Sequence, residues 1–385
     1  MSAAPEDLPE GPLRGYGFTL AVAASVAVAL LRPGWFNGSA YFDIRTRWIF
    51  LAVVQAVMFG MGTQMTLRDF EQVGRAPRGV LVGILCHFSI MPLVGLALAR
   101  LFGFEPEIAA GVILIGCCSS GLSSNVMAFL ARANLALSVT VTAVTTLIAP
   151  VMTPLLMKLL AGRLVEIRFF DMMMQIIEIV IVPIFAALLH DVLRRAPPAG
   201  RRAWLGAAAL GAAWLAGAEY WRMNHAGGTP PGTGFLAANL AAEALTVGTA
   251  YHFLVRAWPR IERAMPGVAM AGVCYFTVVT TAEGRDNLIR VGLWLVLASV
   301  LHNSAGYFFG YWLSRGAGLD RNSARSVAFE VGLQNGAMAS GLAAGMGKIA
   351  TMGLAPAIFS PWMNISGSML ANFWRRRPVE EGEAP

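Results

Sequence analysis

Apolar segments long enough to form membrane-spanning helices follow one another along nearly the whole chain. Only short polar stretches separate them, and most of these contain arginine. A helix needs about 20 predominantly apolar residues to cross the hydrocarbon core of a bilayer. The sequence therefore predicts an all-α polytopic membrane protein with about twelve spans, at residues 16–32, 46–65, 79–102, 106–131, 134–161, 172–190, 203–221, 234–255, 265–281, 288–314, 325–346 and 354–374.

The composition excludes the other broad classes of protein. Of the 385 residues, 56% are apolar and 13% are charged, whereas about a quarter are charged in a typical soluble domain. The four cysteines lie inside apolar segments, without the spacing of a metal site or a disulfide framework. We therefore exclude soluble enzymes, disordered chains and small disulfide-rich domains.

The basic residues indicate topology and not a nucleic-acid surface, although the formal net charge is +7. The arginines lie between apolar segments, as topogenic charges do. With twelve spans and a cytoplasmic N-terminus, 18 of the 29 Lys and Arg residues would face the cytoplasm. We therefore expect cytoplasmic tails at 1–15 and 375–385 and no binding of nucleic acid. The first apolar segment ends without a small-residue cleavage site, so it is expected to be a span and not a signal peptide.

Two polar, glycine-containing stretches interrupt apolar segments at mid-span. They lie at 117–125 and 330–341. Irregular backbone at membrane depth is tolerated only where protein or a wet cavity encloses it. If the segments within 203–255 are an added pair, the stretches fall in the fourth and ninth segments, equivalent positions of two five-helix repeats. This pattern indicates inverted repeats and the binding site of a transporter.

Glu330 is the most informative single residue, because a carboxylate at mid-span needs a partner or a function. It could be a protonated side chain that bonds a neighbouring helix, a cation ligand or a proton carrier. Ser138 and Thr142 share one helical face, although each hydroxyl could instead bond its own helix. Oxygen-bearing side chains favour a hard alkali cation over a transition metal, and the candidates are Ser124, Asn125, Ser138, Thr142 and Gln334.

Other intramembrane polar residues leave alternatives open. His87 could be a hydrogen-bonded core residue, a ligand or a titrating group. Glu178 could lie near an interface, and His302 and Asn303 suit helix packing as well as any other role. No nucleophile elbow or base is recognisable around the serines at 119–124, so the protein is not expected to be an enzyme.

At these residues the sequence resembles the bile acid:sodium symporter family, and its bacterial branch most closely. The similar stretches together span most of the chain outside 200–260. They are Met58-Phe-Gly-Met-Gly with Arg68-Asp-Phe, Gly116-Cys-Cys-Ser-Ser-Gly-Leu-Ser-Ser-Asn-Val-Met, Leu137-Ser-Val-Thr-Val-Thr with Pro150 and Thr153-Pro, Glu330-Val-Gly-Leu-Gln-Asn, and Asn364-Ile-Ser-Gly.

The resemblance implies ten helices in a panel and a core domain, with two broken helices that cross in the core. Panel helices would lie in 16–65 and 166–281, and core helices in 79–161 and 288–374. The segments at 203–255 depart from the family, and we expect two added spans, giving about twelve. The alternative is a re-entrant or interfacial hairpin.

The resemblance also implies the bound species, which are one or two Na⁺ ions and a small organic anion. Where the family has Gln, this chain has His87, so the second ion could be retained or replaced by a proton. Asn335 and Asn364 would face the substrate, next to Met363 where His is common. The first sodium site would comprise Ser124, Asn125, Ser138, Thr142 and Glu330, and the second Glu330, the backbone at Val331 and Leu333, Gln334 and His87.

The function expected from this resemblance is sodium-coupled symport of an organic anion by alternating access. The anion would be a carboxylate or sulfonate, either bile-acid-like or a small organic acid, and the membrane would be the bacterial inner (plasma) membrane. One alternative is proton coupling through His87 and Glu330. Another is a non-transporting sensor or scaffold that keeps the fold. The sequence does not predict the anion's identity or the oligomeric state.

Overall fold

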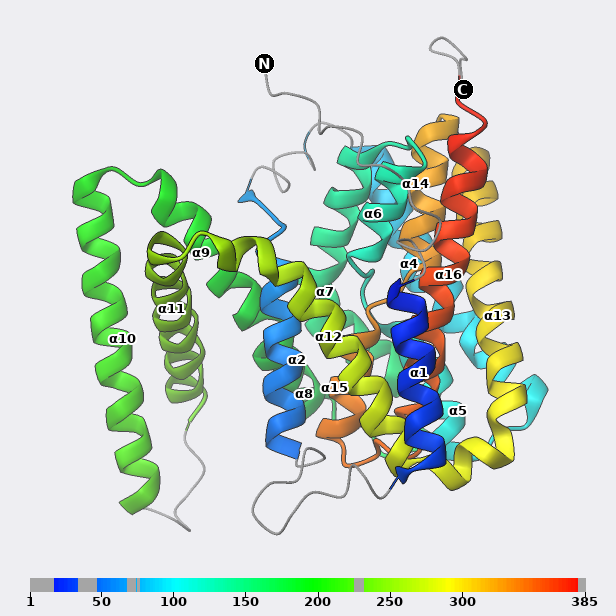
Figure 1. Ribbon diagram of the computed structural model, residues 1–385, viewed down its shortest axis with the longest axis horizontal. Coiled ribbons are helices and arrows are strands. Elements are labelled where there is room, and N and C mark those ends of the chain that lie inside the picture. Colours follow the sequence, from blue (N-terminus) through cyan, green and yellow to red (C-terminus); the bar gives the residue numbers. More distant parts are fainter. Residues whose placement is uncertain (1–16, 34–46, 68–73, 75–76, 225–231, 380–385) are drawn as a thin grey trace.

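The computed structural model describes residues 17–33, 47–67, 74, 77–224 and 232–379. The predicted tail 1–15 lies outside these residues, as do residues 380–385 of the predicted C-terminal tail. The described part is helical and holds no strand, apart from one isolated bridge (Figure 1). Its elements are α1 (Gly17–Leu31), α2 (Arg47–Gly62), α4 (Pro77–Phe102), α5 (Pro106–Cys117), α6 (Ser123–Leu130), α7 (Leu135–Ala161), α8 (Phe169–Ile176), the π-helical turn η3 (Ile177–Ile181), α9 (Val182–Arg195), α10 (Pro198–Asn224), α11 (Thr233–Ala257), α12 (Arg260–Glu283), α13 (Arg285–Gly316), α14 (Arg321–Gly332), α15 (Gly336–Gly345) and α16 (Leu354–Arg375).

The helices have the surface of a protein that lies in lipid. Within the described part, five helical segments are long and apolar enough to cross a bilayer: α4, α7, α8 to α9, α12 and α13. Large apolar side chains also point outwards from them, and Leu101 and Leu293 are 74% and 79% exposed. A water-facing surface seldom exposes so many large apolar groups. The chain is therefore an integral membrane protein.

Two helices are interrupted in the middle, as the polar stretches predicted. The first break separates α5 from α6, and the second separates α14 from α15. The two breaks meet through a bridge between Ser120 and Gln334. Gly121 donates its amide to the Leu333 carbonyl at 3.0 Å, and Asn335 donates its amide to the Ser119 carbonyl at 2.8 Å. Each break thus satisfies backbone groups that the other leaves open, as burial away from water requires.

Glycine at position 121 is required by this close approach. A Cβ atom there would lie 2.7 Å from the carbonyl oxygen of Gln334, well inside van der Waals contact. A side chain would therefore force the two interrupted backbones apart.

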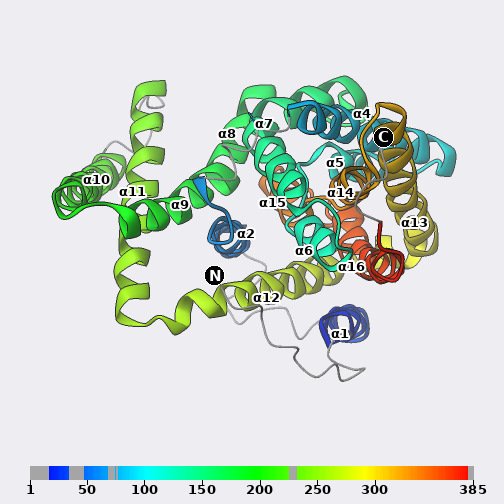
Figure 2. The same cartoon turned by 90° about the horizontal axis from the view of Figure 1, so that it is seen from above.

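The remaining helices pack around the two broken ones. Helices α4, α7, α13 and α16 contact the broken helices directly, while α2 and α12 contact α15 from the other side (Figure 2). The first group corresponds to the predicted core segments 79–161 and 288–374. Whether these segments move as a domain against the panel helices stays a prediction.

The added segments form two long helices that pack side by side at one edge of the molecule. Helix α10 packs on α11, and α11 packs on α9 (Figure 1). Both are longer than the apolar segments predicted at 203–221 and 234–255, and neither is among the five most apolar long helices. Gly248 of α11 sits against the backbone of α9, where a Cβ atom would lie 2.3 Å from the Ala186 carbonyl oxygen.

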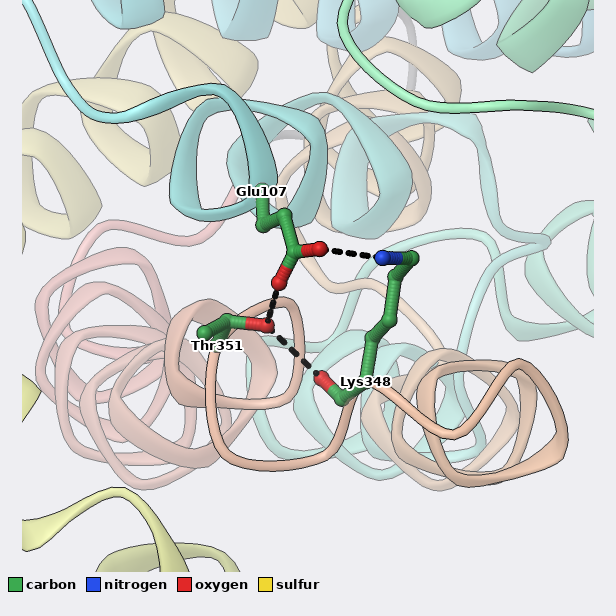
Figure 3. A network of polar contacts seen from close by, with 3 residues as sticks. All are labelled: Glu107, Lys348 and Thr351. Carbon is green, nitrogen blue, oxygen red and sulfur yellow. Dashed lines mark hydrogen bonds and ion pairs between the residues drawn. The ribbon is translucent and has the colours of Figure 1, made fainter.

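A polar cluster ties the outer ends of the two broken helices together (Figure 3). Glu107, in the first turn of α5, forms an ion pair with Lys348 in the loop between α15 and α16. Its other carboxylate oxygen accepts a hydrogen bond of 2.6 Å from Thr351 Oγ1 in the same loop. The broken helices are therefore joined at their outer ends as well as at their breaks.

The packing at Gly248 gives a testable prediction. We expect Gly248→Leu to lower the free energy of unfolding by about 1–3 kcal/mol, because the added side chain overpacks the contact between α11 and α9. Gly217→Leu on α10 is the matched control, since nothing lies within 4 Å of a Cβ atom there. Thermal unfolding of the two purified variants tests this, and equal unfolding temperatures would contradict the close packing.

Candidate functional site

Glu330 lies in the last turn of α14 with its side chain fully buried. Its carboxylate accepts two hydrogen bonds from α7, from Ser138 Oγ at 2.5 Å and from Thr142 Oγ1 at 2.8 Å. The spacing of four residues places both hydroxyls on one helical face. Of the two alternatives for these hydroxyls, the structure shows bonding to the carboxylate.

Helix α6 adds further oxygen atoms to the same cluster. Asn125 Oδ1 accepts from Ser138 Oγ at 2.9 Å and from Thr142 Oγ1 at 3.2 Å. Ser124 Oγ lies 3.3 Å from Thr142 Oγ1 and donates to the Gly121 carbonyl at 2.7 Å. The cluster formed by Ser124, Asn125, Ser138, Thr142 and Glu330 is called the oxygen cluster below.

The oxygen cluster contains more acceptors than protons. The hydroxyls of Ser138 and Thr142 each face both a carboxylate oxygen and Asn125 Oδ1, yet each has one proton to donate. Among the described residues, no Lys or Arg forms an ion pair with Glu330. A buried carboxylate without a basic partner is costly unless it is neutralised. Either a bound cation or a proton on Glu330 would neutralise it.

The chemistry of the donors favours a hard cation. The described residues contain no group of three or more His, Cys, Asp or Glu side chains that could hold a metal ion. Hydroxyl, amide and carboxylate oxygens suit alkali and alkaline-earth ions. Because the cluster offers one carboxylate, a monovalent ion balances its charge.

The residues predicted for a second ion lie at the break between α14 and α15. The Val331 carbonyl accepts a hydrogen bond of 2.6 Å from Gln334 Nε2, and the Leu333 carbonyl accepts one of 3.2 Å from Ser120 Oγ. Gln334 Oε1 is buried without a hydrogen-bond partner. These carbonyls are engaged within the protein, and one amide oxygen remains open.

His87 joins both broken helices to α4. Its Nδ1 lies 2.9 Å from the Glu330 carbonyl oxygen, and its Nε2 lies 2.8 Å from the Cys118 carbonyl oxygen. Both carbonyls are acceptors, and a neutral imidazole has a single N–H. The imidazole therefore lies between two backbone carbonyls, one from each broken helix.

Asn303 and Ser366 support the site in a way that the sequence analysis did not predict. Asn303 Nδ2 donates to the Gly332 carbonyl at 2.8 Å, at the C-terminal end of α14. Ser366 Oγ donates to Asn303 Oδ1 at 2.5 Å. The only sequence signal was an amide inside an apolar segment, which helix packing explains equally well.

A cavity of about 270 Å³ lies on the other side of the breaks, between them and helices α2 and α12. Its polar lining side chains are uncharged amides and hydroxyls. Asn335 Oδ1 caps α15 by accepting from the Met338 amide at 3.0 Å, and Asn364 Nδ2 donates to the Ser360 carbonyl at 2.7 Å. The full lining is Val57, Met61, Gln64, Gly121, Leu122, Ser123, Val126, Met127, Ala269, Met270, Val273, Gln334, Asn335, Gly336, Ala337, Ser360, Met363 and Asn364.

The helix ends give the site opposite polarity in its two parts. Helices α5 and α14 finish at the breaks, so the carbonyl-rich ends of both helices point there. Helices α6 and α15 begin at the breaks, and their first residues, Ser123 and Gly336, line the cavity. Helix C-termini favour cations, and helix N-termini favour anions. A cation and an anion could therefore bind a short distance apart.

Comparison with known proteins finds sodium-coupled transporters. The Sodium Bile acid symporter family matches residues 51–197. The uncharacterized sodium-dependent transporter YocS of Bacillus subtilis is 32% identical over 330 residues, which cover 86% of this chain and 83% of YocS. The probable chloroplastic sodium/metabolite cotransporter BASS1 of Arabidopsis thaliana is 27% identical over 366 residues, covering 95% of this chain and 75% of BASS1. The ileal sodium/bile acid cotransporter of Oryctolagus cuniculus is 37% identical over 119 residues, which cover 31% of this chain and 34% of the cotransporter.

The hydrogen bond from Thr142 to Glu330 gives a second prediction. We expect Thr142→Val to lower the free energy of unfolding by about 1–3 kcal/mol in sodium-free buffer, because a buried carboxylate oxygen loses its donor. Thr146→Val is the matched control, since Thr146 Oγ1 bonds the Thr142 carbonyl of its own helix at 2.8 Å. Thermal unfolding in detergent compares the variants, and equal losses would mean that the hydroxyl does not support the carboxylate.

Proposed function

Since the chain belongs to the sodium bile acid symporter family and is therefore a sodium-coupled membrane transporter and not an enzyme, we propose that it carries an organic anion together with Na⁺ by alternating access. The observation that carries this proposal is the oxygen cluster. It is buried, rich in acceptors and poor in protons, and it joins three helices, α6, α7 and α14.

The coupling ion would bind in the oxygen cluster. Ser124, Asn125, Ser138, Thr142 and Glu330 would supply its ligands. With the ion bound, the hydroxyls of Ser138 and Thr142 could turn their lone pairs towards it, and the carboxylate charge would be balanced. The ion would thereby hold α6 and α7 against α14.

We infer that one Na⁺ ion binds per cycle. The imidazole of His87 stands between the carbonyls of Glu330 and Cys118, where the family resemblance implies part of a second ion site. Nitrogen in a rigid ring is a poor ligand for a hard cation. The break between the half-helices would then be stabilised by Val331, Leu333 and Gln334, and these residues would not bind a second ion.

The anion would bind in the cavity beside the breaks. The N-termini of α6 and α15 and the amides of Asn335 and Asn364 would meet a carboxylate or sulfonate, and Met363 and the other apolar lining side chains would contact its carbon skeleton. At about 270 Å³ the cavity is slightly smaller than the usual range for ligand sites, about 300–1,000 Å³. This size favours a small organic acid over a bile acid.

Coupling would follow from the shared position of the two sites. The oxygen cluster and the cavity lie on opposite sides of the same pair of breaks, so the ion would order the half-helix ends that the anion uses. The core segments 79–161 and 288–374 would then move against the panel segments 16–65 and 166–281.

The arrangement in the membrane is also part of the proposal. We propose twelve spans, with ten in two inverted five-helix repeats and α10 and α11 as the added pair. The lengths of α10 and α11 favour two spans over a re-entrant hairpin. The excess of arginine on one side of the spans favours cytoplasmic termini, and the similarity to YocS favours a bacterial plasma membrane.

A variant of Glu330 tests the sodium site without a known substrate. A ligand that binds only the folded protein stabilises it by RT ln(1 + [L]/Kd), about 2.7 kcal/mol at 100 times Kd. We expect Na⁺ to raise the unfolding temperature more than K⁺ does, and we expect Glu330→Ala to abolish the difference.

Glu178→Gln, a change in a second acidic residue within the spans, is the control for this experiment and should keep the sodium response. Sodium-driven uptake in liposomes would be screened with small carboxylates and sulfonates. A folded Glu330→Ala variant that kept the sodium response or sodium-driven uptake would contradict the proposed ion site.

Proton coupling is the second candidate function, and the contacts of His87 favour it. Both ring nitrogens face carbonyl oxygens, and only the doubly protonated ring can donate to both. A proton on His87 could then replace the second sodium ion during transport.

One experiment separates the two candidates. For sodium coupling with one ion, we expect uptake to follow an imposed Na⁺ gradient with a Hill coefficient of about 1, and His87→Gln to raise the coefficient towards about 2 because a second oxygen-lined site becomes available. Uptake driven by a pH gradient without Na⁺, and lost in His87→Gln, would instead favour proton coupling. An unchanged sodium dependence in His87→Gln would contradict the inferred role of His87.

A further inference from the structure

Two histidines lie against each other at the joint between the added helices and the rest of the molecule. His190 belongs to α9 and His252 to α11, and each lies five residues before the last residue of its helix. The two helices pack side by side (Figure 2). The ring centres of the two histidines are 5.2 Å apart, and the ring planes are inclined by 50°. These two residues are called the histidine pair below.

The ring nitrogens of the histidine pair are buried without a hydrogen-bond partner. This holds for all four nitrogens, and His252 as a whole is only 7% exposed. The backbone of His190 comes near the His252 ring, but no hydrogen bond of normal geometry forms. By contrast, the rings of His87 and His302 bond backbone carbonyls. A buried polar atom without a partner is costly, so the histidine pair needs a partner that the described residues do not supply.

Tyr251 adds one more unpartnered atom beside the histidine pair. Its ring packs edge-on against His190 with the ring centres 5.2 Å apart, and its hydroxyl is buried without a hydrogen-bond partner. The residue is 6% exposed and belongs to an apolar cluster with Phe59 of α2 and Met265 of α12. Unpaired polar atoms therefore gather at one point of an otherwise apolar contact between helices.

The separation of the two rings fits a shared metal ion. Because zinc binds imidazole nitrogen at about 2.0–2.1 Å in tetrahedral geometry, two imidazoles on one ion have ring centres roughly 5 Å apart. The observed 5.2 Å agrees with this value. Two protonated rings at this distance would repel each other. At least one ring is therefore neutral, and neutral imidazole is the form that binds metals.

The surrounding charges indicate which kind of cation the histidine pair would select. Two acidic and three basic side chains act electrostatically on the pair. They are Asp191, Glu262, Arg194, Arg201 and Arg256. Since these charges offset one another, selection would depend on the ligand atoms. Imidazole nitrogen suits zinc, copper and nickel ions, whereas Na⁺, Mg²⁺ and Ca²⁺ prefer oxygen.

We propose that the histidine pair binds one Zn²⁺ ion or a similar transition-metal ion. The described residues contain no group of three or more His, Cys, Asp or Glu side chains that could hold a metal, so water would complete the coordination. The Tyr251 hydroxyl would bond one of these waters. The ion would join α11 to α9 and thereby fix the added helices to the rest of the molecule. This proposal does not depend on the transported anion or on the coupling ion.

The test uses the full-length protein, purified without a polyhistidine tag and freed of metal with EDTA. We expect equilibrium dialysis to give one Zn²⁺ ion per chain, and we expect Zn²⁺ to raise the unfolding temperature more than Mg²⁺ or Ca²⁺ does. His190→Gln and His252→Gln should each weaken zinc binding by at least about 10-fold, since even the loss of a group that supports a metal ligand costs about 10–100-fold. Thermal unfolding of the metal-free variants checks that they fold. The visible absorption of Co²⁺ bound to the unchanged protein tests tetrahedral coordination without any variant.

The matched control is His225→Gln, which removes a histidine that lies outside the described residues. This variant should keep the zinc response. An equal loss of zinc binding in the control would assign the metal to His225 and overturn the proposal. Unchanged zinc binding in either variant of the histidine pair would overturn it as well. Equal stabilisation by Mg²⁺ or Ca²⁺, or an unchanged protein that binds no zinc, would have the same consequence.

Discussion

The meeting of two interrupted helices is the constraint on which the rest of the structure depends. Neither break could exist alone in the membrane, because each leaves backbone amides and carbonyls without partners. Here the groups at Ser119 and Gly121 pair with those at Leu333 and Asn335. This pairing demands contact between backbones, and contact demands glycine at position 121. The surrounding helices must then enclose the breaks completely, which is why α4, α7, α13 and α16 pack so closely around them.

The same interruption gives the transporter its chemistry. An unbroken helix has its charged ends at the membrane surfaces, whereas a broken one brings two further ends to mid-membrane. The C-terminal end of α14 lies at the oxygen cluster, and the first residues of α6 and α15 line the cavity. A cation site and an anion site can thus be built beside each other with one intramembrane carboxylate, Glu330, and without a basic side chain in the cavity lining.

Sequence patterns predicted the parts of this site that depend on local spacing. The helix breaks could be predicted, because a cluster of glycine and polar residues at mid-span is costly in an unbroken helix that faces lipid. The shared face of Ser138 and Thr142 follows from their spacing. Partner choice could not be predicted, since nothing local indicates that His87 bonds two carbonyls from different helices, or that Asn303 holds the end of α14. Helix bounds also differ. Helix α10 begins at Pro198 and includes Arg201 and Arg202, whereas hydropathy alone starts the segment after these two arginines.

The contacts of the broken helices differ in whether transport could change them. The ion pair of Glu107 with Lys348 and the hydrogen bonds of His87 join protein groups to one another, so they can persist with or without a bound ion. In the oxygen cluster, by contrast, two hydroxyl protons are shared among three acceptor atoms, so its best arrangement changes when a cation enters. Only the oxygen cluster would respond to Na⁺, while the ion pair and the His87 hydrogen bonds would stay constant. The free energy of Na⁺ binding would therefore change the position of α6 and α7 relative to α14. An ion can shift a conformational equilibrium only through contacts that differ between the two states, and in the proposed site this cluster provides them.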